Sequence, residues 1–432
     1  MYKENELRAL LQGKRILIAG HGREGQSTQR LLHTLLPDSH PAVAEGNEAI
    51  RQEAAKGYDL IVKSPGIPLA ALEGCCDPAA ITSQTDLFLQ VHADQVVGVT
   101  GTKGKSTTAS LVHAILRSHY GRHALLAGNI GIPLFDIVPD LDSQSIVVCE
   151  LSCHQLEGIR RSPRVGVLLN LFQEHLDHYP SYLAYQMAKM NIGLHQHADD
   201  YFFYCADNAT LRQRVEENQT RLKGHVIPYD LAEARQLQDI HSPLQGDHNL
   251  CNILAAYYVA LIMQVPKHEI VSAINAFQGL AHRMQRVGTY RGITFYDDSI
   301  STIPEACMAA IQALGEVDTL IVGGFDRGID YTALMDFLAA SAVRNLVFVG
   351  QAGRRMLTER GGSPAMQGHH IVQEDDYERI VAWCFRHTQP GHICLLSPAA
   401  ASYDAFKNFE ERGDTFSRLV TQMGEGEALA KQ

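Results

Sequence analysis

The stretch GVTGTKGKSTTASLVHAIL, residues 98–116, constrains the fold of this 432-residue chain more than any other segment. An apolar run precedes a glycine-rich turn, and Lys105, Ser106 and Thr107 then begin a segment with the apolar spacing of a helix. Such a strand–turn–helix offers backbone N–H groups to phosphate oxygens, a lysine to the β- and γ-phosphates and a hydroxyl to Mg²⁺. We therefore expect an α/β domain that binds a nucleoside triphosphate. The strict spacing of a phosphate-binding loop would place a glycine where Val99 stands, so the pattern alone leaves the class of enzyme open.

Length and composition limit the architecture, the partners and the compartment. We expect three domains, because at roughly 100–200 residues per domain the chain divides into two to four units. The net charge of −11 argues against a nucleic-acid or anionic-membrane surface, since those partners need clustered positive charge. No apolar run approaches the ~20 residues of a membrane span, so we expect a cytoplasmic protein that does not insert into membranes. We also expect a monomer. The nine cysteines include no C-x-x-C pair, which favours reduced thiols over a disulfide framework or a zinc site.

A second glycine-rich turn lies near the N-terminus. The apolar run RILIAG leads into Gly20-x-Gly22-x-x-Gly25 and then into a helical segment, which is the context of a nucleotide-diphosphate site. A turn with a purely structural role is the alternative. An NAD site would use Glu45 as its ribose-binding acid, but the surrounding HPAVAEGNEA is a poor strand sequence, so NAD ranks second. The turn of DLIVKSPGIPL, with Ser64, Pro65 and Gly66, would bring further backbone toward the same crevice.

Polar residues also follow the later apolar strands. SIVVCE ends in Glu150, and His175 lies shortly after VGVLLNL. Because the carboxyl ends of parallel strands meet at one edge of a sheet, Glu150 and His175 are candidate metal ligands. His248, Asn249 and Asn252 begin another helical segment, where they either contact an adenine or cap the helix. From about residue 283, short apolar strands alternate with helical segments, which predicts a third doubly wound α/β domain.

Several stretches that occur in order along the chain closely resemble the Mur ligases. They are TGTKGKST, GNIGIP (128–133), ELSCHQLE (150–157), NLFQEHLDHY (170–179), GDHNLCN (246–252), HR (282–283), DDS (297–299), GGFDRGIDY (323–331) and SPAAASYDAFKNFEERG (397–413). The resemblance spans nearly the whole chain and is strongest to the branch that adds glutamate to UDP-N-acetylmuramoyl-L-alanine. It also accounts for Val99, because Mur ligases have TG-T-x-GK-[ST]-T in place of the strict loop.

The resemblance implies a three-domain α/β architecture with Rossmann-like first and last domains and a central ATPase domain. Residues 1–91 would bind the UDP substrate, residues 92–282 ATP and Mg²⁺, and residues 283–432 the amino acid, closing over the site. The implied reaction belongs to peptidoglycan synthesis. The substrate carboxylate attacks the γ-phosphate of ATP, and the amine of glutamate then attacks the resulting acyl phosphate.

The resemblance also assigns roles to individual residues. Lys105, His175 and Lys189 would be catalytic. One Mg²⁺ would be held by Ser106 and Glu150, and a second by His175 and a carbamylated Lys189, which without the family would be an ordinary surface lysine. The ATP-binding residues would be Gly101, Thr102, Lys103, Gly104, Lys105, Ser106, Thr107, Asn252, Arg283 and Asp298. The UDP-substrate residues would be Gly20, Gly22, Gly25, Ser64, Gly66, Asn129 and His154. The glutamate would be bound by Thr302, Arg327, Ser402 and Phe409, whereas Lys407 and Arg412 are equally well surface charges.

Two departures and three alternatives qualify this interpretation. Ile300 replaces a lysine of the family pattern near the amino-acid pocket, which leaves the identity or handedness of the added amino acid open. The first domain is short after Leu36 and has no clear uracil-binding loop. The alternatives are a folylpolyglutamate-type ligase, which would lack the first domain, an NAD-dependent oxidoreductase and a catalytically silent nucleotide-binding regulator.

Overall fold

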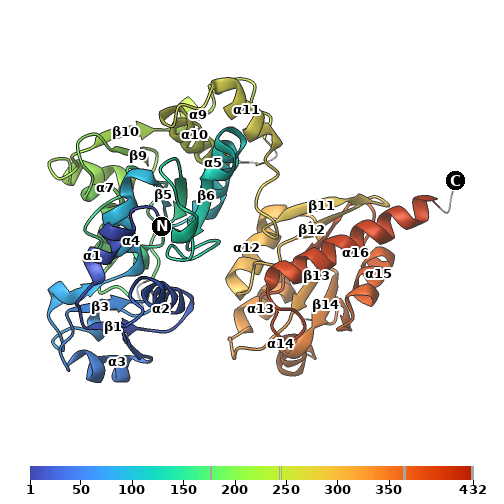
Figure 1. Cartoon of the computed structure of the whole chain (residues 1–432). Helices are drawn as coiled ribbons and strands as arrows, with labels where there is room; N and C mark the ends of the chain where they lie inside the picture. Colours follow the sequence, from blue (N-terminus) through green and yellow to red (C-terminus); the bar gives the residue numbers. More distant parts are fainter. Residues whose placement is uncertain (176–177, 243, 245, 363–365, 430–432) are drawn as a thin grey trace. The chain divides into compact units, whose positions relative to one another are not determined.

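The computed structural model describes residues 1–175, 178–242, 244, 246–362 and 366–429, of which 427–429 without their side chains. Two compact units make up the chain, Met1–Gln278 and Gly279–Gln432. Figure 1 colours the first from blue to yellow and the second from orange to red. No helix in the described ranges combines the length and apolar character that a membrane span needs.

The first unit begins with a small parallel sheet of order β2-β1-β3-β4. Its strands are β1 (Ile16–Ala19), β2 (Ala42–Ala44), β3 (Leu60–Lys63) and β4 (Ile81–Thr82). The accompanying helices are α1 (Glu4–Leu11), α2 (Arg23–Leu35), α3 (Asn47–Ala54) and α4 (Gln84–His92). Strand β2 forms directly before Glu45, in the segment expected to be a poor strand. It is, however, only three residues long.

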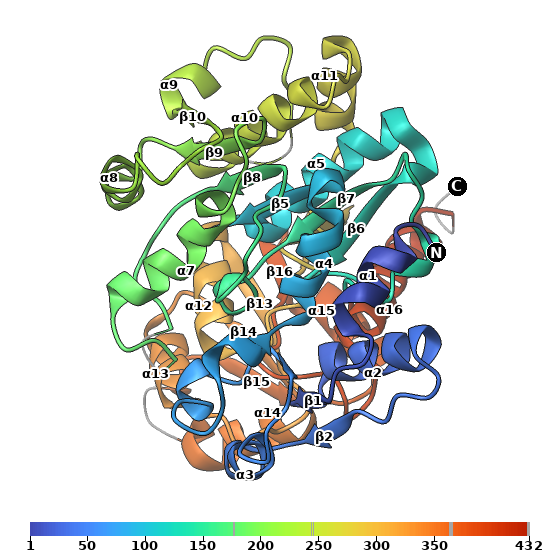
Figure 2. The same ribbon diagram turned by 60° about the vertical axis from the view of Figure 1, so that its left-hand side comes forward.

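A second, six-stranded parallel sheet in the same unit has the order β10-β9-β8-β5-β7-β6. Its strands are β5 (Val96–Thr100), β6 (Ala124–Gly128), β7 (Ile146–Glu150), β8 (Val165–Leu168), β9 (Tyr201–Cys205) and β10 (His225–Tyr229). Its helices are α5 (Lys105–Tyr120), α6 (Cys153–Leu156), α7 (Tyr182–Leu194), α8 (Ala209–Glu217), α9 (Leu231–Ala234), α10 (Asp247–Ile262) and α11 (Lys267–Ala276). Figure 2 shows these elements from another side. The central strands are apolar almost throughout, as strands covered on both faces must be.

Two apolar cores cover the two faces of this second sheet. One is formed with α5, α10 and α11 and includes Val99 and Ile253. The other includes Phe202 and Met190, and it continues without a break into the first sheet, where Leu7 and Ile18 belong to it. The first two sheets therefore form one compact unit.

The second unit contains a sheet of order β11-β12-β16-β13-β14-β15, in which only β11 is antiparallel to its neighbour among the described strands. The strands are β11 (Gln285–Tyr290), β12 (Ile293–Asp297), β13 (Val317–Gly323), β14 (Asn345–Val349), β15 (His370–Gln373) and β16 (Ile393–Leu396). The helices are α12 (Pro304–Leu314), α13 (Thr332–Ala340), α14 (Gly350–Met356), α15 (Tyr377–His387) and α16 (Phe409–Leu429). Asp297 at the end of β12 pairs with Leu396 at the end of β16, so Asp298 and Ser397 emerge at the same edge.

The expected α/β class with three separate sheets is confirmed. The boundaries at 91/92 and 282/283 stay predictions, since the compact units divide between Gln278 and Gly279.

Candidate active site

The glycine-rich loop of residues 101–104 connects β5 to α5. Gly104 has a φ of +83°, and a Cβ atom on it would lie 2.8 Å from the Oδ1 atom of Asn252, so both conformation and space require glycine here. Lys105 is the first residue of α5, and its Nζ atom donates to the carbonyl of Thr102 at 2.9 Å. Ser106 and Thr107 follow in the first turn of this 16-residue helix. The predicted anion-binding turn is therefore formed, and its lysine side chain hydrogen-bonds to the backbone of the turn.

The segment that follows β8 braces this loop. The backbone N–H of Lys103 donates to the side-chain oxygen of Asn170 at 2.9 Å. The Thr102 hydroxyl accepts from the backbone N–H of Phe172 at 2.9 Å and lies 2.8 Å from the hydroxyl of Tyr185, on α7. These contacts hold the backbone of the loop in place before a nucleotide binds.

Glu150 ends β7 next to the strand that leads into the loop. In the parallel pair β5·β7 it is the register partner of Val99. Its side chain is 2% exposed, and its Oε1 atom accepts from the Nδ2 atom of Asn129 at 2.8 Å. Its Oε2 atom is buried and has no hydrogen-bond partner among the described residues. A buried carboxylate oxygen without a donor is costly unless a cation pairs with it, so Glu150 fits a Mg²⁺ ligand.

Lys189 lies on α7 and is 2% exposed, so the interpretation as an ordinary surface lysine was wrong. Its Nζ atom donates to the carbonyl of Gly101 at 2.8 Å, beneath the phosphate-binding loop. Burial, and next the positive charge of Lys105, lower the pKa of Lys189 to about 7. A large fraction of this amine is therefore neutral at physiological pH, and only a neutral amine is nucleophilic.

Three histidines and a tyrosine gather beside the loop. The His154 ring centroid lies 5.0 Å from that of His175 and 4.2 Å from that of His178. The His175 centroid lies 5.9 Å from that of Tyr185, whose hydroxyl contacts the loop. Burial, then His178 and His175, lower the pKa of His154 to about 4, so this imidazole is neutral at pH 7 and can accept a hydrogen bond. Glu150 and His175 thus both lie near the loop of Lys105, as expected; residues 176 and 177 of the NLFQEHLDHY stretch lie outside the described residues.

In the first sheet, the turn after β1 also requires its glycines. A Cβ atom on Gly25 would lie 2.1 Å from the carbonyl oxygen of Gly20, whose φ is +93°. The Ser64 hydroxyl donates to that same carbonyl at 2.9 Å, which joins the two predicted turns. Gly22 is exposed directly before α2, whose start has no side-chain cap, and Gly66 is exposed with open space around it. This arrangement fits a diphosphate at the start of α2.

A buried charge cluster near these turns was missed from the sequence. Lys63, the last residue of β3, is 2% exposed, and its Nζ atom lies 3.3 Å from the Oε2 atom of Glu157. The same Glu157 oxygen lies 3.6 Å from the Nε2 atom of His178. A lysine at the end of the apolar run LIVK was the available signal, because a charge inside such a strand needs a partner once it is buried.

The remaining predicted residues lie in the second unit, except Asn252 on α10, which lies against Gly104. Asp298 is 2% exposed, and its carboxylate accepts from the backbone N–H of Met284 at 3.1 Å and from the Ser397 hydroxyl at 2.7 Å. Burial raises the pKa of Asp298. The Thr302 carbonyl accepts from exposed Arg327 at 2.8 Å. The other three differ in exposure: Ser402 is buried, Phe409 is half-buried and Arg283 is exposed.

Arg412 is not a surface charge, unlike exposed Lys407. It is 1% exposed and donates five hydrogen bonds within the second unit. The acceptors are the hydroxyl and carbonyl oxygens of Ser299 and the carbonyl oxygens of Ala400 and Ala401. One guanidinium thus fixes the loop after β12 against the loop after β16.

Comparison with known proteins agrees with this geometry. Residues 99–260 match the model of the Mur ligase middle domain, and residues 282–400 match that of the Mur ligase glutamate ligase domain. Proteins named "UDP-N-acetylmuramoylalanine--D-glutamate ligase" are similar over most of the chain: that of Listeria innocua is 30% identical, over 95% of this chain and 97% of its own length. This chain belongs to the Mur ligase family. The protein of the same name from Desulfitobacterium hafniense strain Y51 is 33% identical, over 95% of this chain and 98% of its own.

Solved Mur ligase structures have the same fold at low sequence identity. MurF from Acinetobacter baumannii is similar with a TM-score of 0.57 at 17% identity, over 82% of this chain and 87% of that one. MurF from Thermotoga maritima, solved with ADP, gives 0.52 at 16% identity, over 94% and 95%. The Mur ligase variant of the loop also explains Val99, which is a fully buried residue of β5 here.

Proposed function

We propose that this Mur ligase joins D-glutamate to UDP-N-acetylmuramoyl-L-alanine with conversion of ATP to ADP and phosphate, in peptidoglycan synthesis in the cytoplasm. The observation that carries the substrate assignment is the likeness, over 95% of the chain, to ligases that bear this name. The chemistry is supported by the phosphate-binding loop with Lys105, which is held in place by hydrogen bonds. It is also supported by the buried carboxylate of Glu150 beside the loop, of which one oxygen has no hydrogen-bond partner among the described residues.

The first chemical step brings two anions together, because a substrate carboxylate attacks the γ-phosphate of ATP. The Lys105 ammonium at the start of α5 offsets this repulsion, and the N–H groups of residues 101–107 bind phosphate oxygens. Ser106 and Glu150 would hold one Mg²⁺, and His175 with Lys189 a second. These ions supply positive charge to the phosphoryl group as it is transferred. The acyl phosphate is then attacked by the amine of glutamate, and phosphate leaves.

Lys189 is proposed to react with CO₂ before it serves as a ligand. The neutral amine forms a nitrogen–carbon bond with CO₂ and releases one proton, so the neutral amine becomes a carbamate anion. The conversion removes the repulsion with Lys105, which itself lowers the pKa of Lys189, and supplies oxygen donors that Mg²⁺ accepts. The test is Lys189→Ala: we expect loss of activity and partial recovery with short carboxylic acids. An inactive variant that no such acid restores contradicts the carbamate.

The other predicted residues complete the three substrate sites. Asn252, Arg283 and Asp298 are proposed for the adenine, phosphate and ribose of ATP. The turns with Gly20, Gly22, Gly25, Ser64 and Gly66 are proposed for the UDP moiety, and Asn129 and His154 for the muramoyl part. Thr302, Arg327, Ser402 and Phe409 are proposed for glutamate, with the Arg327 guanidinium paired to a carboxylate. We propose that the enzyme acts as a monomer.

Phosphate release in a coupled assay tests the proposal. The enzyme receives ATP, Mg²⁺ and UDP-N-acetylmuramoyl-L-alanine with D-glutamate, L-glutamate or another amino acid in turn. We expect turnover with D-glutamate. Turnover with L-glutamate alone would move the assignment to the other enantiomer, and turnover only with folate-type acceptors would overturn it in favour of a folylpolyglutamate ligase.

A further inference from the structure

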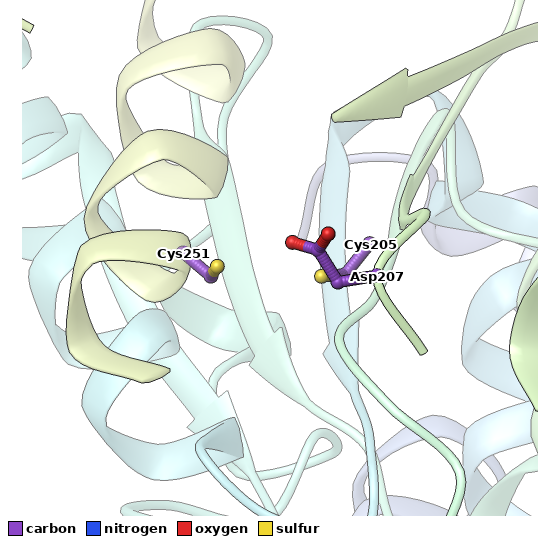
Figure 3. A group of neighbouring side chains, drawn as sticks. All are labelled: Cys205, Asp207 and Cys251. Carbon is purple, nitrogen blue, oxygen red and sulfur yellow. The ribbon is translucent and has the colours of Figure 1, made fainter. Parts of the chain in front are cut away.

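The carboxyl-terminal end of β9 brings together two thiols and a carboxylate that have no part in the proposed reaction. Cys205 ends β9, Asp207 follows two residues later, and Cys251 lies on α10. One ligand atom from each, the two sulfurs and a carboxylate oxygen, lie within 4.8 Å of one another. In Figure 3 the Cys205 sulfur and the Asp207 carboxylate both point toward the Cys251 sulfur.

The surroundings of these atoms suit a metal ligand set. The backbone N–H groups of Asp207 and Asn208 help to lower the pKa of the Cys205 thiol, and so favour the thiolate form that a metal binds. The backbone N–H of Leu231 donates to the Oδ2 atom of Asp207 at 2.7 Å and so fixes the carboxylate. Cys205 is buried, Cys251 is half-buried and Asp207 is exposed, so the group has a protein side and a solvent side.

The electrostatics of the two thiols differ in a way that favours stepwise deprotonation. A hydrogen bond from Cys251, together with the backbone donors, lowers the pKa of Cys205, whereas the same contact, with burial, raises the pKa of Cys251. A divalent cation reverses this for Cys251, because coordination replaces the thiol proton.

We propose that Cys205, Asp207 and Cys251 bind a thiophilic divalent cation of the Zn²⁺ class, with a fourth position open to water. Two thiolates and one carboxylate are a donor set that zinc accepts and that Mg²⁺, which demands oxygen ligands, does not. The bound ion links the end of β9 to α10. It thereby fixes the helix turn from which Asn252, the next residue, reaches Gly104 of the phosphate-binding loop.

Cobalt(II) is the probe that tests this site in the full-length protein. The chain is treated with a chelator, reduced with a phosphine and titrated with Co²⁺. We expect a thiolate-to-cobalt charge-transfer band that saturates at one equivalent, that Zn²⁺ abolishes and that excess Mg²⁺ leaves unchanged. Unfolding temperature rises with Zn²⁺ in the same titration, since the ion binds the folded chain.

Variants assign the band to these residues. Cys251→Ala and Cys205→Ala should each abolish it, and Asp207→Asn should weaken Co²⁺ binding at least about tenfold. Each variant is first shown to be folded by circular dichroism. The matched control is Cys75→Ala with Cys76→Ala, which removes two half-buried thiols from the segment between β3 and β4 and should leave the band intact.

Three results overturn the proposal. One is the absence of a charge-transfer band in the reduced wild-type protein, and another is a band that persists in Cys251→Ala. The third is a Cys205–Cys251 disulfide that forms in air equally fast with and without Zn²⁺, which identifies a redox pair instead. The cobalt titration tests the metal site separately from the proposed ligase activity. Glu150→Gln alters the proposed active site but not these three ligands, so it should keep the cobalt band whether or not it retains activity.

Discussion

Replacing Arg412 by methionine tests whether one buried guanidinium holds together the loops of the second unit. The change removes five hydrogen bonds and leaves four buried oxygen atoms of Ser299, Ala400 and Ala401 without this donor. The Ala401 carbonyl still accepts from the backbone N–H of Phe325, and the Ser299 hydroxyl still donates to the Phe409 carbonyl. The other two acceptors, both carbonyls, are left unsatisfied at about 2 kcal/mol each, and the two remaining lost contacts cost about 1 kcal/mol each, so the loss is about 6 kcal/mol. Burial lowers the pKa of Arg412, so relief of its desolvation returns several kcal/mol. We expect a net destabilisation of about 3 kcal/mol, because methionine keeps the apolar volume.

Urea unfolding followed by tryptophan fluorescence measures this loss, since the single tryptophan, Trp383, lies on α15 of the same unit. In a thermal scan the unfolding temperature should fall by roughly 6–12 °C for a unit of this size. Arg418→Met is the matched control: Arg418 is exposed on the same helix, α16, where its guanidinium donates to the side-chain oxygen of Gln422 at 3.1 Å. We expect less than about 0.5 kcal/mol there. An Arg412→Met variant that is as stable as this control would refute the reasoning.

Three further predictions concern the first unit and the amino-acid pocket. Glu150→Gln keeps a carbonyl oxygen for Asn129 but removes the anion, so kcat should fall about 100-fold without loss of stability; a fully active variant would exclude Glu150 as a ligand. Lys189 is neutral in the folded chain above about pH 7 but protonated up to about pH 10 when unfolded, so folding releases a proton and stability rises with pH across this window. In CO₂-free buffer, Lys189→Met should lower that slope by at most about 1.4 kcal/mol per pH unit, and identical slopes in urea titrations would contradict a buried neutral amine. Ile300→Lys restores the cation of the family pattern and should lower the KM for D-glutamate in the phosphate-release assay; an unchanged KM would place residue 300 outside the pocket.

Much of the first unit's site could be predicted, because local sequence determines it. The glycines of the phosphate-binding loop mark positions where any other residue would have an unfavourable φ. At Gly104 an added Cβ atom would also collide with Asn252. Glu150 was identifiable because parallel strands deliver their carboxyl-terminal residues to one edge. His175 follows β8 in the same way. The positions of these residues follow from the order of strands and turns, and short sequence patterns are enough to predict that order.

Other features depend on tertiary packing and could not be predicted from the sequence. Arg412 lies in a charged run, FEERG, whose exposed and buried members cannot be told apart without the loops that accept its hydrogen bonds. The burial of Lys189 depends on the packing of α7 beneath the loop rather than on its neighbours in YQMAKMNIG. Cys205 and Cys251 are far apart in the sequence, so the absence of a C-x-x-C pair said nothing about whether their sulfurs meet.

The apolar core that continues from the first sheet into the second determines how the chain can be cut for experiments. A fragment that starts after α4 would lose Leu7 and Ile18 and leave the Phe202 side of the second sheet facing water. Such a fragment should aggregate when expressed, whereas a cut between Gln278 and Gly279 leaves each piece with its own interior. Isotope labelling of either half by ligation at that junction is therefore practical, and an isolated ATP-binding fragment is not.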